Sequence, residues 1–373
     1  MSWLRYFLLI TLLVGLATCH KVEQGGGKPT FADCGCDSLW ADSTTQEFVD
    51  LLETTTRSNH PIWKGYPLGD AAFVLYAGLT QDSTHCLGLW KQGEAMAYLC
   101  SADIPSMLTP LYSYYLNYPD TLVGDAKLFG TYQNAPIFSA WMEENEVDAA
   151  VFMPTDFPKF PFKIPAKVKT QLAIHEAFHI EVTLRKWYTG KGFWPKWDVQ
   201  PDRAQVQNCY LGDSIAEGLI DREQETLALL VEALLDQDKP EAMRLAEEFL
   251  EARQLRYDHL EGTEVSLTEQ TQGDCQAGEA LMEIEEGIAD YASWVKMFDI
   301  GTVSREDLLR RYRAKQKDKF YLTGCMLLHA SVLMSGGKEM EVISKMVNAP
   351  SLEEGSLLTV FKAQLATYRE SGS

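Results

Sequence analysis

The chain has 373 residues, of which 46% are hydrophobic and 23% charged, and this composition excludes an intrinsically disordered protein. Its 53 acidic residues outnumber the 33 basic ones, which gives a formal net charge of −20. Because such a charge repels phosphate backbones, we expect no nucleic-acid partner.

The N-terminus has the pattern of an export signal. Arg5 supplies a positive charge, residues 7–14 form a short apolar segment, and small residues lead up to Cys19. Residues 16–19 also resemble a bacterial lipobox, in which Cys19 carries a lipid anchor; simple signal cleavage is the alternative. We therefore expect an exported protein, either anchored to a membrane as a lipoprotein or free in the periplasm or outside the cell. Residues 1–19 form the leader and 20–40 a tether.

After the tether, the sequence predicts a small sheet followed by helices. A capping box at 43–46 begins a helix that runs to about residue 56, and short apolar strands follow at 72–77, 86–90, 95–100 and 148–153. Helices are predicted from Pro165 to about 187, and then at 213–236, 241–260, 277–298, 304–336 and from 351 onward. We predict an α+β fold: an N-terminal part at 41–160 with a small antiparallel sheet, and a mainly helical part at 161–373.

Eight cysteines in an exported chain predict disulfides, but their number alone does not give the pairing. One pair can be argued from the strands. A hairpin turn centred on Gly93 places Cys86 opposite Cys100, within disulfide range. Two independent buried thiols are the alternative.

The chemistry is concentrated in one pentapeptide, His175-Glu-Ala-Phe-His179, on the helix that begins at Pro165. At a spacing of four, two imidazoles project from one helix face, close enough to share a zinc ion, and Glu176 lies beside them to hold a water. The alternative is a helix whose histidines belong to the core or the surface. The residues around them are mostly apolar, and two buried imidazoles would need partners.

A catalytic zinc needs a third protein ligand and an open position for water. Glu286 precedes Asp290 by one turn, and Asp290 is the only charged residue in 287–295. We therefore expect Asp290 to be buried and to hydrogen-bond the free nitrogen of a ligating imidazole. Glu217 has an aspartate at the same spacing but lies among other charges. We predict Glu286 as the third ligand, with Glu217 as the alternative, and expect Gly287 to let this helix approach the histidine helix closely.

HExxH followed on a second helix by Glu-x-x-x-Asp resembles the gluzincins, the thermolysin-like zinc metallopeptidases. The resemblance implies a zincin-like fold for the helical part, which forms one catalytic unit with the N-terminal part. It also implies zinc ligands His175, His179 and Glu286, with Glu176 as general base. Asp290 is implied as the partner of His175. Segments 62–66 and 321–324 are similar to exported bacterial proteins with HExxH and no assigned substrate.

We therefore expect zinc-dependent hydrolysis of peptide bonds in a peptide or protein substrate, with Glu176 taking the proton of a zinc-activated water. The alternative is a non-catalytic exported lipoprotein or binding protein in which HExxH is structural or accidental. A fourth protein ligand would mark a closed, structural site.

Two further questions stay open in the sequence. Arg253 and Arg256 share a helical stripe with apolar residues, so we expect both to point inward. A structural ion pair, for instance with Glu283, is one interpretation; recognition of a peptide carboxylate is the other. The candidate donors to an oxyanion are His259, His329, Tyr210 and Tyr291.

Overall fold

A computed structural model of the protein describes residues 40–57, 61–63, 66–67, 69, 71–77, 86–100, 144–147, 150–155, 164–179, 182, 206–207, 209–266, 272–314 and 319–371. The predicted leader and nearly all of the tether lie outside these residues. The predicted end of the histidine helix near residue 187 lies outside them as well. Among the described residues, no helix is long and apolar enough to cross a membrane.

The N-terminal part contains a four-stranded sheet whose spatial order is β5-β4-β3-β6. Its strands are β3 (Ala72–Ala77), β4 (Cys86–Lys91), β5 (Glu94–Cys100) and β6 (Val151–Pro154). The first three are antiparallel neighbours, which confirms that part of the prediction, but β6 pairs with β3 in parallel. The prediction was wrong for β6 because strand direction depends on the path of the connection and not on the apolar pattern of a short strand. Two smaller ribbons pair β1 (Pro61–Trp63) with β2 (Tyr66–Pro67) and β7 (Glu264–Ser266) with β8 (Gln272–Asp274).

The hairpin between β4 and β5 follows the sequence prediction. Gln92 and Gly93 both have positive φ, at 56° and 71°, as the two-residue turn that suits twisted strands requires. A register shift between Leu89 and Trp90 then brings Cys86 opposite Cys100, which confirms the predicted juxtaposition. Cys86 is disulfide-bonded.

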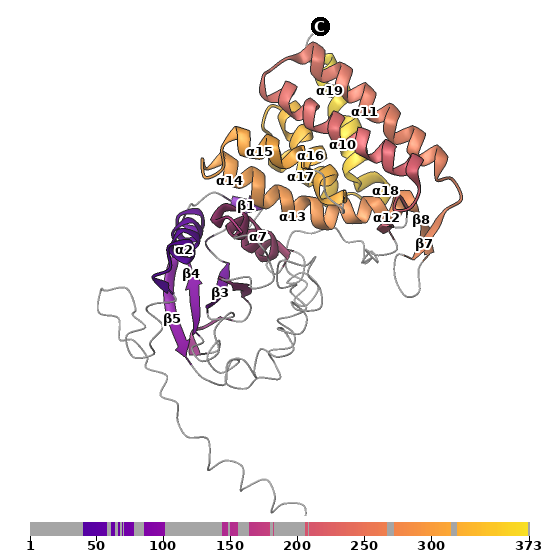
Figure 1. Ribbon diagram of the computed structural model, residues 1–373. Helices are drawn as coiled ribbons and strands as arrows, with labels where there is room; N and C mark the ends of the chain where they lie inside the picture. Colours follow the sequence, from indigo (N-terminus) through magenta and orange to yellow (C-terminus); the bar gives the residue numbers. More distant parts are fainter. Residues whose placement is uncertain are drawn as a thin grey trace, which may run out of the picture.

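Helix α2 (Ser43–Thr56) lies beside this sheet and packs on α7 (Ala166–Phe178), the helix that carries the two histidines (Figure 1). The helix begins where the sequence predicts, but Asp42 caps it: its carboxylate accepts hydrogen bonds from the backbone N–H groups of Thr44 and Thr45. The capping box predicted from Ser43 is therefore wrong by one residue.

The C-terminal part is helical, with the long antiparallel pair α10 (Ser214–Leu235) and α11 (Lys239–His259) on one side (Figure 1). The remaining segments are α12 (Cys275–Met282), η3 (Glu283–Gly287), α13 (Ile288–Asp290), η4 (Tyr291–Val295), α14 (Lys296–Asp299), α15 (Arg305–Tyr312), α16 (Phe320–Met334), α17 (Glu339–Val347), α18 (Leu352–Gly355) and α19 (Leu357–Glu370). Helix α16 is buried on almost all sides and packs against α10, η3 and α19.

Two helix predictions in this part are wrong in their extent. The helix predicted over 304–336 is divided into α15 and α16, because the first ends at Tyr312 and the second begins at Phe320. The last predicted helix is divided as well: Ser351 caps α18, and Ser356 begins α19 with a new cap. Residues 313–319 are charged or polar apart from Ala314, so no apolar periodicity supported a helix across the first break. The second break falls at Gly355 and Ser356.

The helix predicted over 277–298 forms as a continuous helical stretch, Cys275–Asp299, that contains the π-helical segments η3 and η4. A Cβ atom added at Gly287 would lie 2.5 Å from Cα of Gly324 in α16. Gly287 therefore allows a close approach to α16 and not, as predicted, to the histidine helix. The two glycines face each other across this contact.

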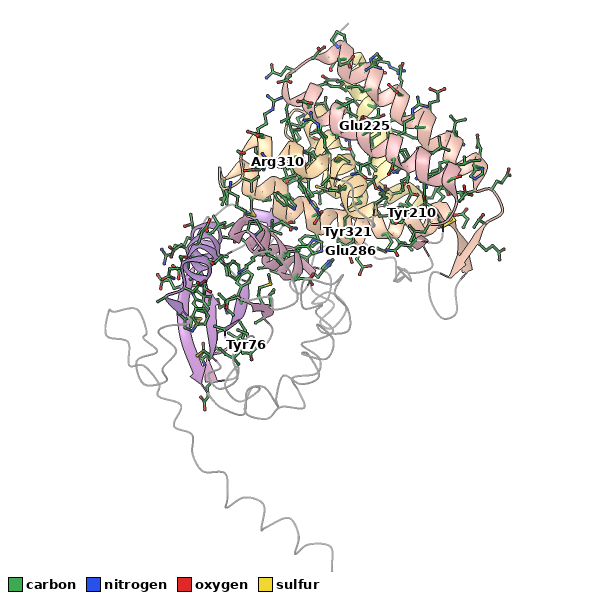
Figure 2. All side chains as sticks on the ribbon, in the orientation of Figure 1. Tyr76, Tyr210, Glu225, Glu286, Arg310 and Tyr321 are labelled. Carbon is green, nitrogen blue, oxygen red and sulfur yellow. A yellow bond between two sulfur atoms is a disulfide. The ribbon has the colours of Figure 1, made fainter. Side chains whose placement is uncertain are left out.

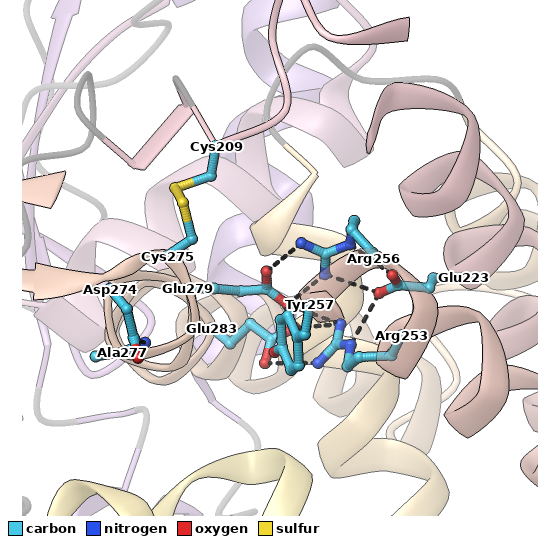
Figure 3. Close-up of polar contacts among 10 residues, drawn as sticks. All are labelled: Cys209, Glu223, Arg253, Arg256, Tyr257, Asp274, Cys275, Ala277, Glu279 and Glu283. Atoms are coloured by element: carbon cyan, nitrogen blue, oxygen red, sulfur yellow. Dashed lines mark hydrogen bonds and ion pairs between the residues drawn. A yellow bond between two sulfur atoms is a disulfide. The ribbon is translucent and has the colours of Figure 1, made fainter. Parts of the chain in front are cut away.

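A buried ion-pair cluster joins α10, α11 and the start of this helical stretch (Figure 3). Arg253 bonds Glu223 at 2.8 Å and Glu283 at 2.8 Å, while Arg256 bonds Glu223 at 2.6 Å and Glu279 at 2.6 Å. All five side chains are at most 2% exposed. The structural interpretation of the two arginines is therefore confirmed. The disulfide Cys209–Cys275, which sequence reasoning did not find, closes the same end of the helical part.

One continuous hydrophobic core runs through both parts, from Phe48 and Val74 to Leu227 and Phe361. Helix α7 lies where the parts meet: it contacts α2 and β6 on one side and α13 and η4 on the other (Figure 1). The histidine helix is thus held by both the sheet and the helical bundle.

Candidate metal centre

Helix α7 begins at Ala166, directly after its N-cap residue Pro165, which has φ −58° and ψ 144°, and this confirms the predicted helix start. Ala173, Ile174, Ala177 and Phe178 are buried in the core and fix the helix rotation. The side chain of His175, on the remaining face, lies against η3 and α13. The burial of these apolar residues therefore decides where the two imidazoles point.

Three donor atoms converge at this face. Nε2 of His175 lies 3.1 Å from Oε2 of Glu286, Nε2 of His179 lies 3.3 Å from the same oxygen, and the two nitrogens are 3.2 Å apart. Among the described residues these three form the one group of His, Cys, Asp and Glu side chains with metal-site geometry. Figure 2 shows Glu286 on the side of the helical part that faces α7.

The donor set fits a tetrahedral zinc ion. Ligands at about 2.0–2.1 Å from a tetrahedral ion lie about 3.3 Å from one another. The three distances between the donor atoms, 3.1–3.3 Å, are close to this value. Two imidazoles and one carboxylate are also the ligand types of catalytic zinc sites.

Asp290 holds the imidazole of His175 from behind. Its Oδ1 lies 3.0 Å from Nδ1 of His175. Burial alone would raise the pKa of Asp290, but the Arg311 guanidinium and the bond to His175 lower it below the ordinary value. An ionised carboxylate can only accept, so Nδ1 donates to it and Nε2 is the nitrogen that faces the centre and could bind a metal.

The centre favours a positive charge. Burial lowers the pKa of His175, but the hydrogen bonds to Asp290 and Glu286 outweigh burial and raise it to about 10. The pKa of His179 is raised as well, because the charge of Glu286 overcomes burial. The imidazoles in turn hold the pKa of Glu286 well below its usual range despite burial. Either protons or a bound cation can supply this charge.

Glu176 is half-buried, and its negative charge contributes to the raised pKa of both His175 and His179. It therefore lies within electrostatic range of the centre without belonging to the three converging donors.

The alternative ligand lies elsewhere. Glu217 is exposed in the first turn of α10, where its carboxylate accepts a hydrogen bond from the backbone N–H of Gly212 at 2.8 Å. The aspartate at the same spacing, Asp221, is exposed and pairs with Lys319. Neither belongs to the group around the histidines.

The candidate oxyanion donors have other partners. His259 bonds Asp213 near the surface, the hydroxyl of Tyr291 donates to Glu339, and His329 lies 2.8 Å from the hydroxyl of Tyr312. Tyr210 packs on the ring of Phe320.

Sequence reasoning assigned no role to three residues around His175. The ring of Tyr321 stacks on this imidazole with centroids 5.5 Å apart and planes 12° apart. Gln171, one turn earlier on α7, donates to Asp290 at 3.1 Å, and Arg311 donates to it at 2.7 Å. Only Gln171 carried a sequence signal, because it stands four residues before His175 on the same helix face.

Comparisons with protein-family models, with curated proteins and with solved structures find no match to this chain. The resemblance to gluzincins thus depends on two short motifs.

Proposed function

We propose that the protein is a zinc-dependent metallohydrolase of gluzincin type, most simply a peptidase, with His175, His179 and Glu286 as zinc ligands. The observation that carries the proposal is the convergence of these three donors at 3.1–3.3 Å, with Asp290 bonded behind His175. Glu286 and Asp290 lie far from the histidines in the sequence. From a second helical stretch, Glu286 supplies the third donor and Asp290 the hydrogen-bond partner of His175.

Zinc, when bound, would lower the pKa of a coordinated water towards about 7 and polarise the scissile carbonyl. Glu176 accepts the proton of the attacking water and returns it to the leaving amine. Asp290 keeps the proton of His175 on Nδ1, so that Nε2 stays available. The surrounding core excludes water from the back of the centre, which strengthens these electrostatic interactions.

The non-catalytic alternative predicts a different ligand set. A structural zinc site is closed by a fourth protein ligand, whereas a catalytic site has three and keeps an open position. The group formed by the described residues has three members, and this supports the catalytic proposal.

The test separates metal binding from catalysis. Glu176→Gln should retain about one zinc per chain and lose roughly 10²- to 10⁴-fold of its hydrolysis of a fluorogenic peptide library, because only the proton acceptor is removed. His179→Ala and Glu286→Ala should lose the metal itself. Glu217→Ala, which removes an exposed carboxylate of similar spacing, is the control and should leave both properties unchanged. Wild-type protein that binds no zinc would refute the proposal.

We also propose that the protein is exported, by signal cleavage or as a lipoprotein anchored through Cys19. The disulfide Cys209–Cys275 and the disulfide-bonded Cys86 support this proposal. Disulfides persist in oxidising compartments and are rare in a reducing cytosol.

A further inference from the structure

The carboxylate of Asp290 is buried, and both of its oxygens have hydrogen-bond partners. Its side chain is 2% exposed. Oδ1 lies 3.0 Å from Nδ1 of His175 and accepts from Nε2 of Gln171 at 3.1 Å, while Oδ2 accepts from a guanidinium nitrogen of Arg311 at 2.7 Å. The two oxygens therefore face different elements, since Oδ1 is directed at the candidate metal centre and Oδ2 at α15.

Arg311 comes from a helix that contributes no ligand to the centre. It lies at the end of α15, its side chain is 21% exposed, and its guanidinium lies over the ring of Trp294 at 5.7 Å. Helix α15 is also tied to the histidine helix, because Asp307 pairs with Lys167 of α7 at 2.8 Å. The helix therefore contacts both the histidine helix and the helical stretch that carries Asp290.

We propose that Arg311 is a positioning residue for the candidate metal centre, acting through Asp290 on the imidazole of His175. The inference rests on the proposed function, because positioning matters here only if the imidazole binds a metal. A carboxylate can rotate about its Cβ–Cγ bond, and a bond at one oxygen leaves that rotation open. Arg311 at Oδ2 and Gln171 at Oδ1 fix the plane from both ends, so Oδ1 faces Nδ1 and Nε2 is aimed at the centre.

The charge of Arg311 has a second effect on the same carboxylate. A buried carboxylate with no cationic partner is costly, so it would move towards water or draw in another partner. Arg311 offsets this cost while leaving Oδ1 available to His175. An arginine suits the position better than a lysine, because its extended guanidinium can bond the carboxylate while its charge lies over the ring of Trp294.

The test is the zinc affinity of the full-length protein, measured by competition with a chromophoric chelator. Arg311→Met removes the bond and the charge and should weaken zinc binding by about tenfold or more, as changes to the outer partners of a metal site do. Arg311→Lys keeps the charge and should recover part of the loss. Arg310→Met is the matched control, because Arg310 is a 67% exposed neighbour that pairs with Glu306 and Asp307 on the surface. Its zinc affinity should equal that of the wild type.

Two further measurements distinguish positioning from a general loss of structure. In a double-mutant cycle, Asp290→Asn with Arg311→Met should bind zinc about as weakly as Asp290→Asn alone, because the arginine acts through this carboxylate. The visible absorption spectrum of the cobalt(II)-loaded protein should change in Arg311→Met and not in Arg310→Met, since the spectrum reports ligand geometry at the ion. Both measurements can also be made with Arg311→Lys if Arg311→Met does not fold.

The proposal is overturned if Arg311→Met binds zinc as tightly as the wild type, or if its effect simply adds to that of Asp290→Asn. A wild-type protein without zinc affinity would instead refute the proposed function, so the two failures are distinguishable.

Discussion

Gly324→Ala is the substitution whose consequence follows most directly from the packing. A Cβ atom at this position would lie 2.4 Å from the carbonyl oxygen of Glu283, 2.8 Å from its Cα and 2.9 Å from its carbonyl carbon. Carbon atoms in contact are ordinarily separated by about 3.5–4.0 Å. All three neighbours are backbone atoms of η3, so no side chain can rotate away. Helices α16 and η3 would have to separate by about 1 Å.

The expected change in the free energy of unfolding is the difference between two effects. Overpacking a filled core costs about 1–3 kcal/mol, and a clash with backbone lies at the upper end of that range. Replacing a helical glycine by alanine gains about 0.5–1 kcal/mol of helix stability. We therefore expect the free energy of unfolding to fall by about 2 kcal/mol. Because η3 carries Glu286, and ligand distances at a zinc site hold to about 0.2 Å, zinc affinity should fall as well.

Gly218→Ala is the matched control. Gly218 is an exposed glycine within α10, and a Cβ atom there would meet nothing within 4 Å. The free energy of unfolding of this variant should rise by about 0.5–1 kcal/mol, a change of the opposite sign. Urea unfolding of the metal-free proteins measures both values. Equal stability of Gly324→Ala and the wild type would show that α16 and η3 do not approach each other this closely.

Three further predictions concern other parts of the chain. Replacing Cys209 and Cys275 by serine opens a loop with a sequence separation of 66 residues and should lower the free energy of unfolding by about 2–4 kcal/mol in urea titrations. Burial, aided by Lys296, lowers the pKa of His329 to about 3. Since unfolded histidine titrates near 6.5, His329 alone should contribute a loss of about 2 kcal/mol of stability between pH 7 and pH 5. The change in the free energy of unfolding over this range, measured in urea titrations, should therefore differ by about that amount between the wild type and His329→Gln. Mass spectrometry of protein from its native host should show an N-terminus at or near Cys19, and an intact Met1 would contradict export.

The sequence predicted the structure where the spacing or type of neighbouring residues determines which side chains lie together. A spacing of four on a helix brings His175 and His179 together, since consecutive turns share a face. The isolated charge of Asp290 in an apolar run required a buried partner, and the structure places one 115 residues away in the chain. The turn at Gly93 is a third example, but the pairing of Cys86 with Cys100 also needs the register shift between Leu89 and Trp90, which no sequence pattern indicated.

The features that were not predicted depend on contacts between distant segments. Gly287 indicated a close helix approach, but the identity of the neighbour, Gly324, is a property of the folded packing. The π-helical segments η3 and η4 have no signature in residue spacing, since the same residues fit an α-helix. Arg311 stands in a charged helix beside Arg310, and nothing local distinguishes the arginine that turns inward from its exposed neighbour.

The segment from Glu283 to Asp290 is held from three directions, and this bears on how the candidate centre would bind a metal. Arg253 of the buried ion-pair cluster fixes Glu283 at one end, and Arg311 fixes Asp290 at the other. Between them the backbone lies directly against α16 at Gly324. None of these contacts involves a metal ion, so the protein itself holds Glu286 beside the two imidazoles. Binding then needs little ordering of the ligands, which is the arrangement expected of a site whose geometry is set by its supporting residues.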